Sequence, residues 1–275
     1  MNLCNLSSEI SLSDSGIWVV KGHRDFGYLK DDATNWIEIE DASFWYRHRA
    51  KVFASIVRRY HQAGFIFEVG AGNGAVSMVL QNAGFDVVAM EPTLACAQNA
   101  RNRGVRNVIC ASLDNVGIPD GSLANVGLFD VLEHIDDHDE FMAQLRNLMR
   151  NHGLIFIAVP AYDWLWSTED EYAGHRRRYT LSHLRRLVER SGFRVEFGSY
   201  YFRPLVAPVL MLRTIPSLIR LRRTRTAQGS VREHCLGTGL VSTVLDAMLA
   251  KEAATLEGGG RYSFGASLLL VARAE

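Results

Sequence analysis

The sequence predicts an α/β fold, with a mostly parallel sheet, helices on both faces and a helical cap inserted before the last strand. Short apolar runs alternate with helix-length segments from residue 65 onward, a glycine-rich turn follows the first run, and a strand-like run returns at the end of the chain. With 275 residues, 48% of them hydrophobic, the chain can bury a sizeable core.

The elements follow in order along the chain. Two short β-like runs at 17–20 and 26–29 precede a helix-like segment, SFWYRHRAKVFASIVRRY, that starts at Ser43. Apolar runs then predict strands at 65–69, 85–91, 107–112, 124–132, 154–160, 193–201 and 261–274. Helices are expected between them, one starting after Ala75, one capped by Thr93, one at 136–151 and one capped by Thr180. This alternation is typical of parallel strands joined by helical crossovers.

Composition narrows the possible partners and location. Acidic and basic residues balance at 30 each, so the whole chain has no net charge that would attract nucleic acid. The apolar stretch 205–221 is interrupted by two arginines and two prolines, and no secretory leader is evident. We therefore expect a cytoplasmic protein without a bound metal, whose cysteines are reduced because they lack paired spacing: Cys4, Cys96, Cys110 and Cys235.

The glycine turn after the first core strand predicts a bound nucleotide-like cofactor. Missing side chains let a ligand approach the backbone N–H groups at a helix N-terminus. Gly70-x-Gly72-x-x-Ala75 fits the dinucleotide fingerprint, with Glu91 near the expected ribose-binding position. Glu68-x-Gly70-x-Gly72-x-Gly74 fits equally well the form seen in S-adenosylmethionine (SAM) methyltransferases, so the turn alone leaves both cofactors open.

Other segments resemble class I SAM-dependent methyltransferases. EVGAGNG at 68–74, Glu91, the Ala111–Leu113 segment and FDVLEHIDD at 129–137 occur in the order typical of that family. FWYRHR at 44–49 and GHRRRYT at 174–180 are similar to segments of a bacterial small-molecule subgroup. The resemblance implies a Rossmann-like sheet of seven strands with an antiparallel last strand. It also implies four parts: N-terminal strands and a cofactor-covering helix (1–60), the SAM-binding core (61–200), a basic and apolar cap (201–258) and the final strand (259–275).

The resemblance also implies which residues bind SAM and release S-adenosylhomocysteine (SAH). Glu91 would accept hydrogen bonds from both ribose hydroxyls, while Asp130 and Arg49 would hold the methionine end. Ser112 stands where the family usually has an aspartate, which places the adenine contact in doubt. The predicted cofactor residues are Glu68, Gly70, Ala71, Gly72, Gly74, Glu91, Pro92, Ser112, Leu113, Phe129, Asp130, Trp45 and Arg49.

Candidate acceptor-site residues come from the loop after the fifth core strand, because ligands of open α/β sheets bind outside the carboxyl ends of strands. His175, His134 and Tyr162 are the predicted catalytic residues, with His175 as a base near neutral pH. Trp166, Asp170 and Arg178 are predicted to contact the substrate. An alternative is that the GHRRRYT segment only fastens the loop to the helix that follows.

The predicted function is methyl transfer from SAM to a small molecule, with oxygen favoured over nitrogen as the acceptor. Residues 197–232 contain seven arginines and no acid, so a membrane-associated enzyme with a lipid-like substrate is one alternative, with peripheral membrane contact through 201–225. A cap or homodimer contact is the other interpretation of this segment. A SAM-binding regulatory or assembly protein without turnover also stays open.

Overall fold

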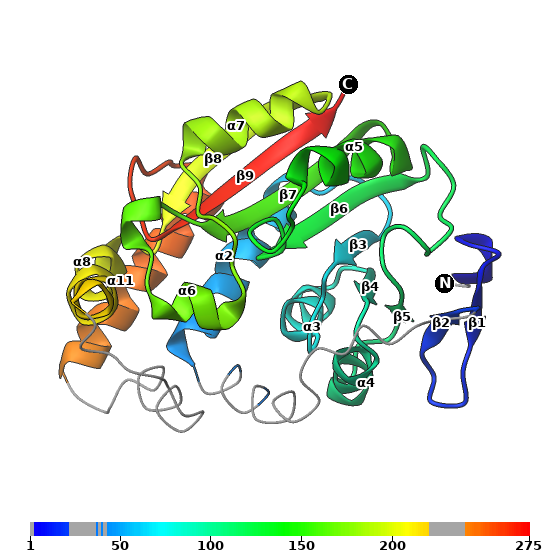
Figure 1. Cartoon of the computed structure of the whole chain (residues 1–275), viewed down its shortest axis with the longest axis horizontal. Coiled ribbons are helices and arrows are strands. Elements are labelled where there is room, and N and C mark those ends of the chain that lie inside the picture. Colours follow the sequence, from blue (N-terminus) through cyan, green and yellow to red (C-terminus); the bar gives the residue numbers. More distant parts are fainter. Residues whose placement is uncertain (1–2, 22–36, 38–39, 41–42, 220–239) are drawn as a thin grey trace.

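A computed structural model describes residues 3–21, 37, 40, 43–219 and 240–275. One sheet contains all nine described strands, in the order β1-β2-β5-β4-β3-β6-β7-β9-β8 (Figure 1). The expected run at 26–29 and the cap arginines at 220, 222, 223, 225 and 232 lie outside the described residues. The strands are β1 (Ile10–Leu12), β2 (Trp18–Val20), β3 (Ile66–Val69), β4 (Val87–Glu91), β5 (Val108–Cys110), β6 (Leu123–Phe129), β7 (Met149–Pro160), β8 (Phe193–Tyr201) and β9 (Ser267–Ala274).

Helices occupy the connections, as the alternating pattern predicts. The N-cap Thr180 accepts a hydrogen bond from the backbone N–H of His183, at 3.2 Å. The α-helices are α2 (Phe44–Tyr60), α3 (Ala75–Asn82), α4 (Leu94–Arg103), α5 (His138–Leu148), α6 (Thr168–Ala173), α7 (Leu181–Arg190), α8 (Val206–Val209), α9 (Ile215–Leu218) and α11 (Leu240–Glu257). Shorter turns are the 3-10 helices η1 (Leu3–Asn5), η2 (Asp163–Leu165) and η3 (Arg203–Leu205), and the π-helix η4 (Leu210–Thr214).

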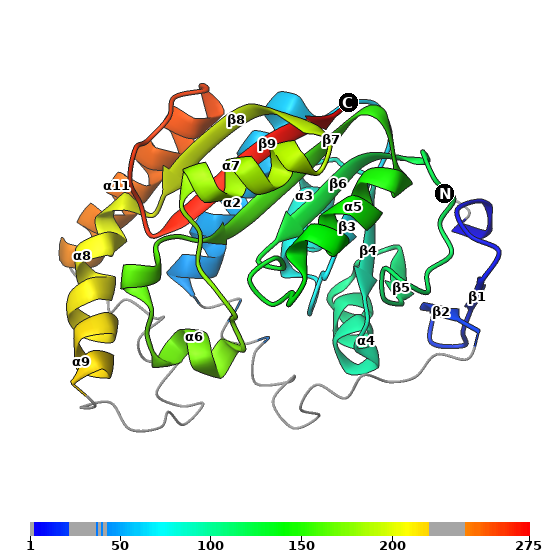
Figure 2. The same cartoon turned by 45° about the horizontal axis from the view of Figure 1, so that its top comes forward.

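Strand residues alternate between two apolar layers. On one face, Ile155 and Ile157 pack in a cluster that includes residues of α5 and α7. On the other face, Leu154 and Phe156 pack in a cluster with residues of α2, α3 and α11. Figures 1 and 2 show these helices on opposite sides of the sheet. Because both faces are covered, the core strands are continuous apolar runs rather than alternating ones.

The predicted seven-strand core is present, and its last strand is antiparallel. β9 lies between β7 and β8 and pairs antiparallel with both. The N-terminal hairpin of β1 and β2 adds two strands, because β2 pairs in parallel with β5 at the sheet edge. The helix expected at 136–151 is shorter: Met149 pairs with Leu123 and begins β7, so tertiary pairing prevails over helix periodicity there.

The carboxyl ends of the central strands meet at one edge of the sheet. β6 ends at Phe129 and β7 at Pro160, and Pro160 lies opposite Ser267, the first residue of β9. Ser267 also pairs with Tyr201 at the end of β8. The residues after β6 and β7 and those before β9 therefore gather on the side where ligands of such sheets bind.

The parts of the cap that the structure describes, residues 202–219 and 240–258, are mostly helical, and one buried carboxylate attaches them to the core. Glu252 of α11 accepts hydrogen bonds from the backbone N–H groups of Phe202 and Arg203, at 2.8 and 2.9 Å. His48 of α2 lies 2.9 Å from the same carboxylate. Among the described residues, we find no helix with the length and apolarity needed to span a membrane.

Candidate active site

Three glycines shape the turn between β3 and α3. Gly70, Gly72 and Gly74 have φ values of 71°, 53° and 77°, a backbone region that disfavours other residues. A Cβ on Gly70 would lie 2.8 Å from a methyl group of Val131, so the loop after β6 packs directly on this turn. Ala71 is buried, and its N–H donates to the Met90 carbonyl at 3.0 Å.

The Glu91 carboxylate forms hydrogen bonds to the backbone of the glycine turn and to that of Thr93. One oxygen accepts from the Gly72 N–H at 2.9 Å and the other from the Thr93 N–H at 3.0 Å. Burial raises the pKa of Glu91, and these hydrogen bonds oppose that shift. Each carboxylate oxygen has a second lone pair, so Glu91 can still accept hydrogen bonds from a ligand.

A cavity of about 430 Å³ opens beside this turn, at the ends of β3 to β6. Four of the predicted cofactor residues line it: Gly70, Pro92, Ser112 and Leu113. Its other lining residues are Val69, Met90, Asp114, Val131, Ile135, Asp137, Glu140, Phe141 and Gln144. Apolar walls with a few carboxylates at the rim suit a flat, hydrogen-bonding group such as a nucleoside.

Other predicted cofactor residues do not line this cavity: Ala71, Gly72, Gly74 and Glu91 form or hold the turn beside it, and Glu68 and Phe129 are buried in the core. Glu68 is 2% exposed, and its carboxylate accepts a hydrogen bond from the Ser77 hydroxyl. Burial raises the pKa of Glu68 to about 7. Phe129 stacks on Phe53 of α2, with ring centroids 4.4 Å apart. In this structure Glu68 is hydrogen-bonded to α3, and Phe129 packs against α2.

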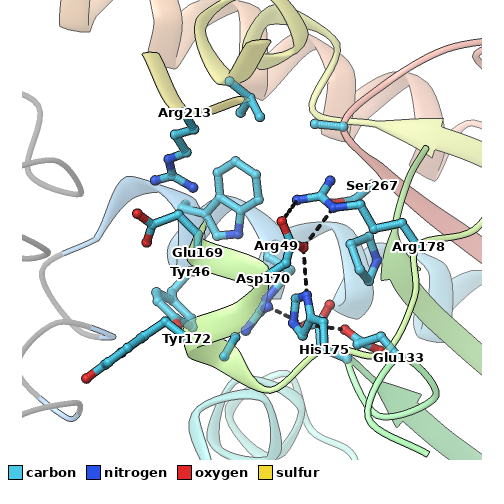
Figure 3. A pocket seen from close by; sticks show the side chains of 16 residues that line it. Tyr46, Arg49, Glu133, Glu169, Asp170, Tyr172, His175, Arg178, Arg213 and Ser267 are labelled. Atoms are coloured by element: carbon cyan, nitrogen blue, oxygen red, sulfur yellow. Dashed lines mark hydrogen bonds and ion pairs between the residues drawn. The ribbon is translucent and has the colours of Figure 1, made fainter. Parts of the chain in front are cut away.

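A second cavity, of about 170 Å³, lies at the ends of β6, β7 and β9 (Figure 3). It is lined by α2, α6, the loop before α7 and the cap. The predicted residues in its lining are Trp45, Arg49, Asp130, Asp170, His175 and Arg178. Asp130 lines this cavity and Val131 lines the first, so adjacent residues of one loop separate the two cavities.

Arg49 and Asp130 form an ion pair at the wall of the second cavity. Asp130 directly follows β6 and has a φ of 58°, which turns the chain sharply at the strand end. Burial opposes the charge of Arg49, but the neighbouring Asp130 outweighs it and raises the pKa of the guanidinium. The pair thus offers one positive and one negative group side by side.

Asp170 organises the polar wall opposite this pair. Its carboxylate is 1% exposed and accepts two hydrogen bonds from Arg178, at 2.7 and 2.9 Å. His175 Nδ1 lies 2.8 Å from it, and the Ser167 N–H donates to it at 2.9 Å. Burial alone would raise the pKa of Asp170, but the bonds from His175 and Arg178 lower it to about 2. Asp170 is therefore an ionised positioning group whose oxygens already have partners.

Glu133 and His134 lie behind His175. Glu133 is fully buried, and an oxygen of its carboxylate lies 3.9 Å from His175 Nε2. Burial, and then the charge of Asp130, raises the pKa of Glu133 well above its usual range. The His134 ring meets the His175 ring edge to face at 4.9 Å, and burial followed by repulsion from His175 lowers the pKa of His134.

The GHRRRYT segment both fastens the loop and supplies the cavity. Tyr179 is fully buried, and its hydroxyl donates to the Leu132 carbonyl at 3.1 Å. The Arg176 N–H donates to the Glu133 carbonyl at 2.7 Å. His175, in contrast, presents its ring to the cavity (Figure 3). Tyr179 and Arg176 therefore fasten the loop, whereas His175 lines the cavity, so each of the two interpretations of this segment holds for different residues.

Three predicted catalytic or substrate-contacting residues do not line the cavity: His134, which packs on His175, Tyr162 and Trp166. Tyr162 stacks between Trp164 and Tyr200, with ring centroids 5.2 and 5.0 Å apart. Trp166 ends the short turn η2 and is half-buried. Trp45 does line the cavity, where it stacks on Phe202 at 4.0 Å.

Several cavity residues were not among the predicted site residues. They come from the short helix α6, the cap and the start of β9: Glu169, Tyr172, Arg213 and Ser267. Glu133 was also not selected, although it stands inside the FDVLEHIDD motif. The position of Ser267 opposite Pro160 depends on strand pairing across more than 100 residues, which no local pattern indicates.

A Rossmann-like sheet with an apolar cavity at its glycine turn, and with a charged cavity at the ends of the next strands, is typical of α/β proteins that bind nucleotide-like ligands. A family model described as a methyltransferase domain matches residues 45–196. That range is more than half of the chain, which therefore belongs to this methyltransferase family.

Two curated relatives carry the name probable S-adenosylmethionine-dependent methyltransferase. The one from Mycobacterium tuberculosis is 25% identical over 124 residues, covering 45% of this chain and 45% of the relative. The one from Mycolicibacterium smegmatis is 23% identical over 161 residues, covering 58% and 62%. The chain thus spans about half to three fifths of the curated relatives it matches.

Solved structures of methyltransferases share the fold at low identity. A Haloferax volcanii methyltransferase in complex with its activator superposes with a TM-score of 0.56 at 15% identity, covering 90% of this chain and 97% of that chain. An Archaeoglobus fulgidus SAM-dependent methyltransferase gives 0.52 at 17% identity, covering 86% and 98%. Phosphoethanolamine N-methyltransferase 2 of Haemonchus contortus, in complex with SAM, gives 0.53 at 14%, covering 90% and 57%. At these identities the likeness shows the fold alone.

Proposed function

We propose that this protein transfers the methyl group of SAM to an oxygen atom of a small-molecule acceptor. The observation that carries the proposal is that two consecutive residues at the carboxyl end of β6 line different cavities, Asp130 the smaller and Val131 the larger. A cofactor in the larger cavity with its methionine end at Asp130 would point its methyl group toward the smaller cavity. Family membership and the names of the relatives support this arrangement.

The cofactor can be placed from the residues upward. The adenine would lie against Pro92, Ser112 and Leu113 in the larger cavity. The ribose hydroxyls would bond to the remaining lone pairs of Glu91. At the other end, SAM carries an ammonium and a carboxylate on one carbon, and the neighbouring Asp130 and Arg49 match these two charges.

The smaller cavity supplies the requirements of the transfer step. As the acceptor oxygen bonds to the methyl carbon, the carbon–sulfur bond breaks and the positive sulfonium becomes a neutral thioether. Aligning the reacting atoms at about 3 to 3.5 Å can supply several kcal/mol of the barrier. A hydroxyl acceptor also loses a proton. Because ionised Asp170 accepts from His175 Nδ1, the Nε2 atom is left with a lone pair that can take this proton.

Calorimetric titration of the protein with SAM and SAH tests the cofactor assignment. In Gly70→Ala, a Cβ would strike Val131 at the cavity wall, so we expect binding at least tenfold weaker. Gly121→Ala is the matched control, because Gly121 has a similar φ of 68° with no atom within 4 Å of the added carbon. Binding of NAD in place of SAM, or equal SAM binding by both variants, would remove the assignment.

The acceptor class requires a separate test. Incubating the protein with methyl-labelled SAM and a metabolite extract should give a labelled small molecule, and mass spectrometry should place the label on oxygen. Label on nitrogen would reject the favoured acceptor. SAM binding without transfer to any fraction would favour a regulatory protein that keeps the fold.

A lipid-like acceptor is the second candidate, supported by exposed apolar residues on the cap. Leu212, Leu218 and Ile219 are 66%, 75% and 61% exposed. Such residues beside arginines suit the surface of an anionic membrane. Flotation with anionic vesicles should then depend on Leu212 and Leu218, and replacing both by glutamate should abolish it. Absence of flotation by the unaltered protein would remove this candidate.

A further inference from the structure

Glu133, His134 and His175 form a compact cluster of metal-ligating groups behind the smaller cavity. One ligand atom from each residue lies within 4.8 Å of the other two. The residues come from the loop after β6 and from the loop before α7, which the Arg176-to-Glu133 backbone bond holds together. Figure 3 shows Glu133 and His175 directed toward each other. Two chain segments 41 residues apart thus converge on one point.

The Glu133 carboxylate lacks the partners that burial demands. It is 0% exposed, and neither of its oxygens has a hydrogen-bond partner in the described part of the chain. His134 Nδ1 is buried without a partner as well. Leaving a buried polar group without a hydrogen-bond partner is unfavourable, and more so when the group is charged. The Glu133 carboxylate and His134 Nδ1 both offer lone pairs and both lack a partner among the described residues. Because both groups can bind metals, their proximity points to a ligand between them.

The tautomer of His175 suits the same ligand. Ionised Asp170 can only accept at Nδ1, so the proton of a neutral His175 is on that nitrogen and the Nε2 lone pair faces Glu133. Metal-binding histidines typically donate their other N–H to a carboxylate in this way. Arg178 and the Ser167 N–H in turn hold Asp170 in place.

We propose that Glu133, His134 and His175 bind one divalent transition-metal ion, with Zn²⁺ the best match. Two imidazoles and one carboxylate are typical ligands of zinc and its first-row neighbours, whereas magnesium and calcium prefer oxygen alone. Zinc bonds of about 2.0 to 2.2 Å place ligand atoms roughly 3 to 3.5 Å apart, so small side-chain rotations would close the cluster. The fourth position would face the cavity that Glu133 and His175 line.

The ion would deepen the proposed function, on which this part of the inference rests. A cation at the cavity wall would bind an acceptor oxygen and lower its pKa. It would also occupy Nε2 of His175, so the proton-accepting role given above to that atom belongs to the metal-free protein. The acceptor class then narrows to hydroxylated molecules that can ligate a metal.

Titrating chelator-treated protein with Zn²⁺ in a calorimeter tests the site without any acceptor. We expect one ion per chain, bound at least a hundredfold more weakly by Glu133→Gln and by His134→Gln. Asp170→Asn, which removes the ionised acceptor of His175 and also of Arg178, should weaken binding tenfold to a hundredfold in the fraction of protein that stays folded. Co²⁺ gives a second readout, because absorption typical of a four-coordinate ion should appear with the native protein and disappear with Glu133→Gln.

His183→Gln is the matched control, because His183 is also half-buried with a second histidine ring 5.9 Å away. It should bind Zn²⁺ as the native protein does. The metal site is rejected if Glu133→Gln binds Zn²⁺ as tightly as the native protein does. It is also rejected if the native protein does not bind one equivalent of Zn²⁺. SAH titration of the same samples separates the two proposals: intact SAH binding shows that the fold survives, and loss of zinc binding alone leaves the cofactor assignment standing.

Discussion

At the scale of single residues, the buried carboxylates determine how the site is held together. Asp170, Glu68 and Glu91 are each less than 10% exposed, yet their oxygens accept hydrogen bonds from different donors. Asp170 has a charged partner in Arg178, whereas Glu68 has only a hydroxyl. The same residue chemistry therefore leads to opposite pKa shifts and opposite responses to pH.

Replacing Asp170 with asparagine should destabilise the fold by about 3 to 5 kcal/mol, because the buried Arg178 then loses its charged partner. Urea unfolding at pH 7 measures the loss. Glu171→Gln, a change of an exposed neighbour, should stay within about 0.5 kcal/mol. If Asp170→Asn and the native protein unfold at the same urea concentration, the hydrogen bonds between Asp170 and Arg178 contribute no net stability.

The pKa of Asp170 also predicts an acid response. Its folded pKa of about 2 lies below the ordinary value near 4, so its stabilising effect is complete above pH 4. That effect, about 2 kcal/mol, is lost as the pH falls from about 4 to about 2. The stability of Asp170→Asn should therefore approach that of the native protein in acid, and a difference independent of pH would contradict this assignment.

Glu68 should respond in the opposite direction. Burial raises its folded pKa to about 7, so the folded protein binds a proton that the unfolded chain has already released. The stability it contributes is present at low pH and is lost as the pH rises through 7. Glu68→Gln removes the titration, and its stability relative to the native protein should increase by about 2 kcal/mol between pH 5.5 and pH 8. Paired urea unfolding curves at the two pH values measure this, and a constant difference would rule it out.

The predicted site residues that line a cavity lie close to strand ends in the sequence. Gly70 and Pro92 directly follow β3 and β4, and Ser112 and Leu113 come two and three residues after β5, so recognising the strands predicts that they lie at one edge of the sheet. The importance of Glu133 depends on its burial and on its contact with His175, which lies near Glu133 only because the chain returns to the end of β6 after passing through α5, β7 and α6. Such non-local contacts leave no periodic signature in a single sequence.

At the scale of elements, the contact between the cap and the core depends on Glu252. Its carboxylate accepts the two backbone N–H groups at the start of η3 and lies beside His48 of α2. It therefore satisfies donors that a 3-10 turn leaves without intrahelical partners. The cap in turn contributes Val209 and Arg213 to the smaller cavity.

Glu252→Ala should loosen the cap and destabilise the protein by about 2 to 4 kcal/mol, because two buried donors lose their acceptor. Hydrogen exchange at the Phe202 and Arg203 amides should accelerate with it. Glu257→Ala, which removes a half-exposed partner of Arg58, should cost less than about 1 kcal/mol. Unchanged amide exchange in Glu252→Ala would show that packing alone fixes the cap.

Element boundaries show where sequence periodicity stops being informative. The long core strands were predicted well because burial on both faces makes them continuous apolar runs. The strand Ile10–Leu12 was not predicted, since three residues carry too little pattern. β7 begins at Met149 because Met149 pairs with Leu123 across the sheet, although the helical pattern of α5 continues through that residue.

At the scale of the whole molecule, both cavities lie at one edge of the sheet, and helices and the cap contribute the remaining lining residues. The helices on both faces of the sheet exclude water from the strands. The N-terminal hairpin extends the sheet beyond the seven-strand core. β2 pairs with β5 through Trp18 opposite Ile109 and Val19 opposite Cys110, so β5 is not an edge strand.

Removing residues 1–20 should therefore affect stability and solubility more than cofactor binding. The truncation exposes the backbone groups of β5 and removes buried Leu3, Leu6 and Ile17, which should cost at least about 3 kcal/mol. Light scattering should detect association through the new edge, and urea unfolding should show a lower midpoint. SAH should still bind, because the larger cavity is lined by residues from Val69 onward.

The control for this truncation is Leu12→Ala, which changes an exposed side chain of the same hairpin and should leave the midpoint within about 0.5 kcal/mol. A monodisperse truncated protein with the native midpoint would show that the hairpin contributes nothing to the stability of the sheet. Loss of SAH binding by a folded truncated protein would instead mean that the hairpin acts on the cofactor site through β5. β5 ends two residues before Ser112, which lines the larger cavity. The effect of the truncation on stability and its effect on SAH binding can therefore be separated only if both are measured on the same sample.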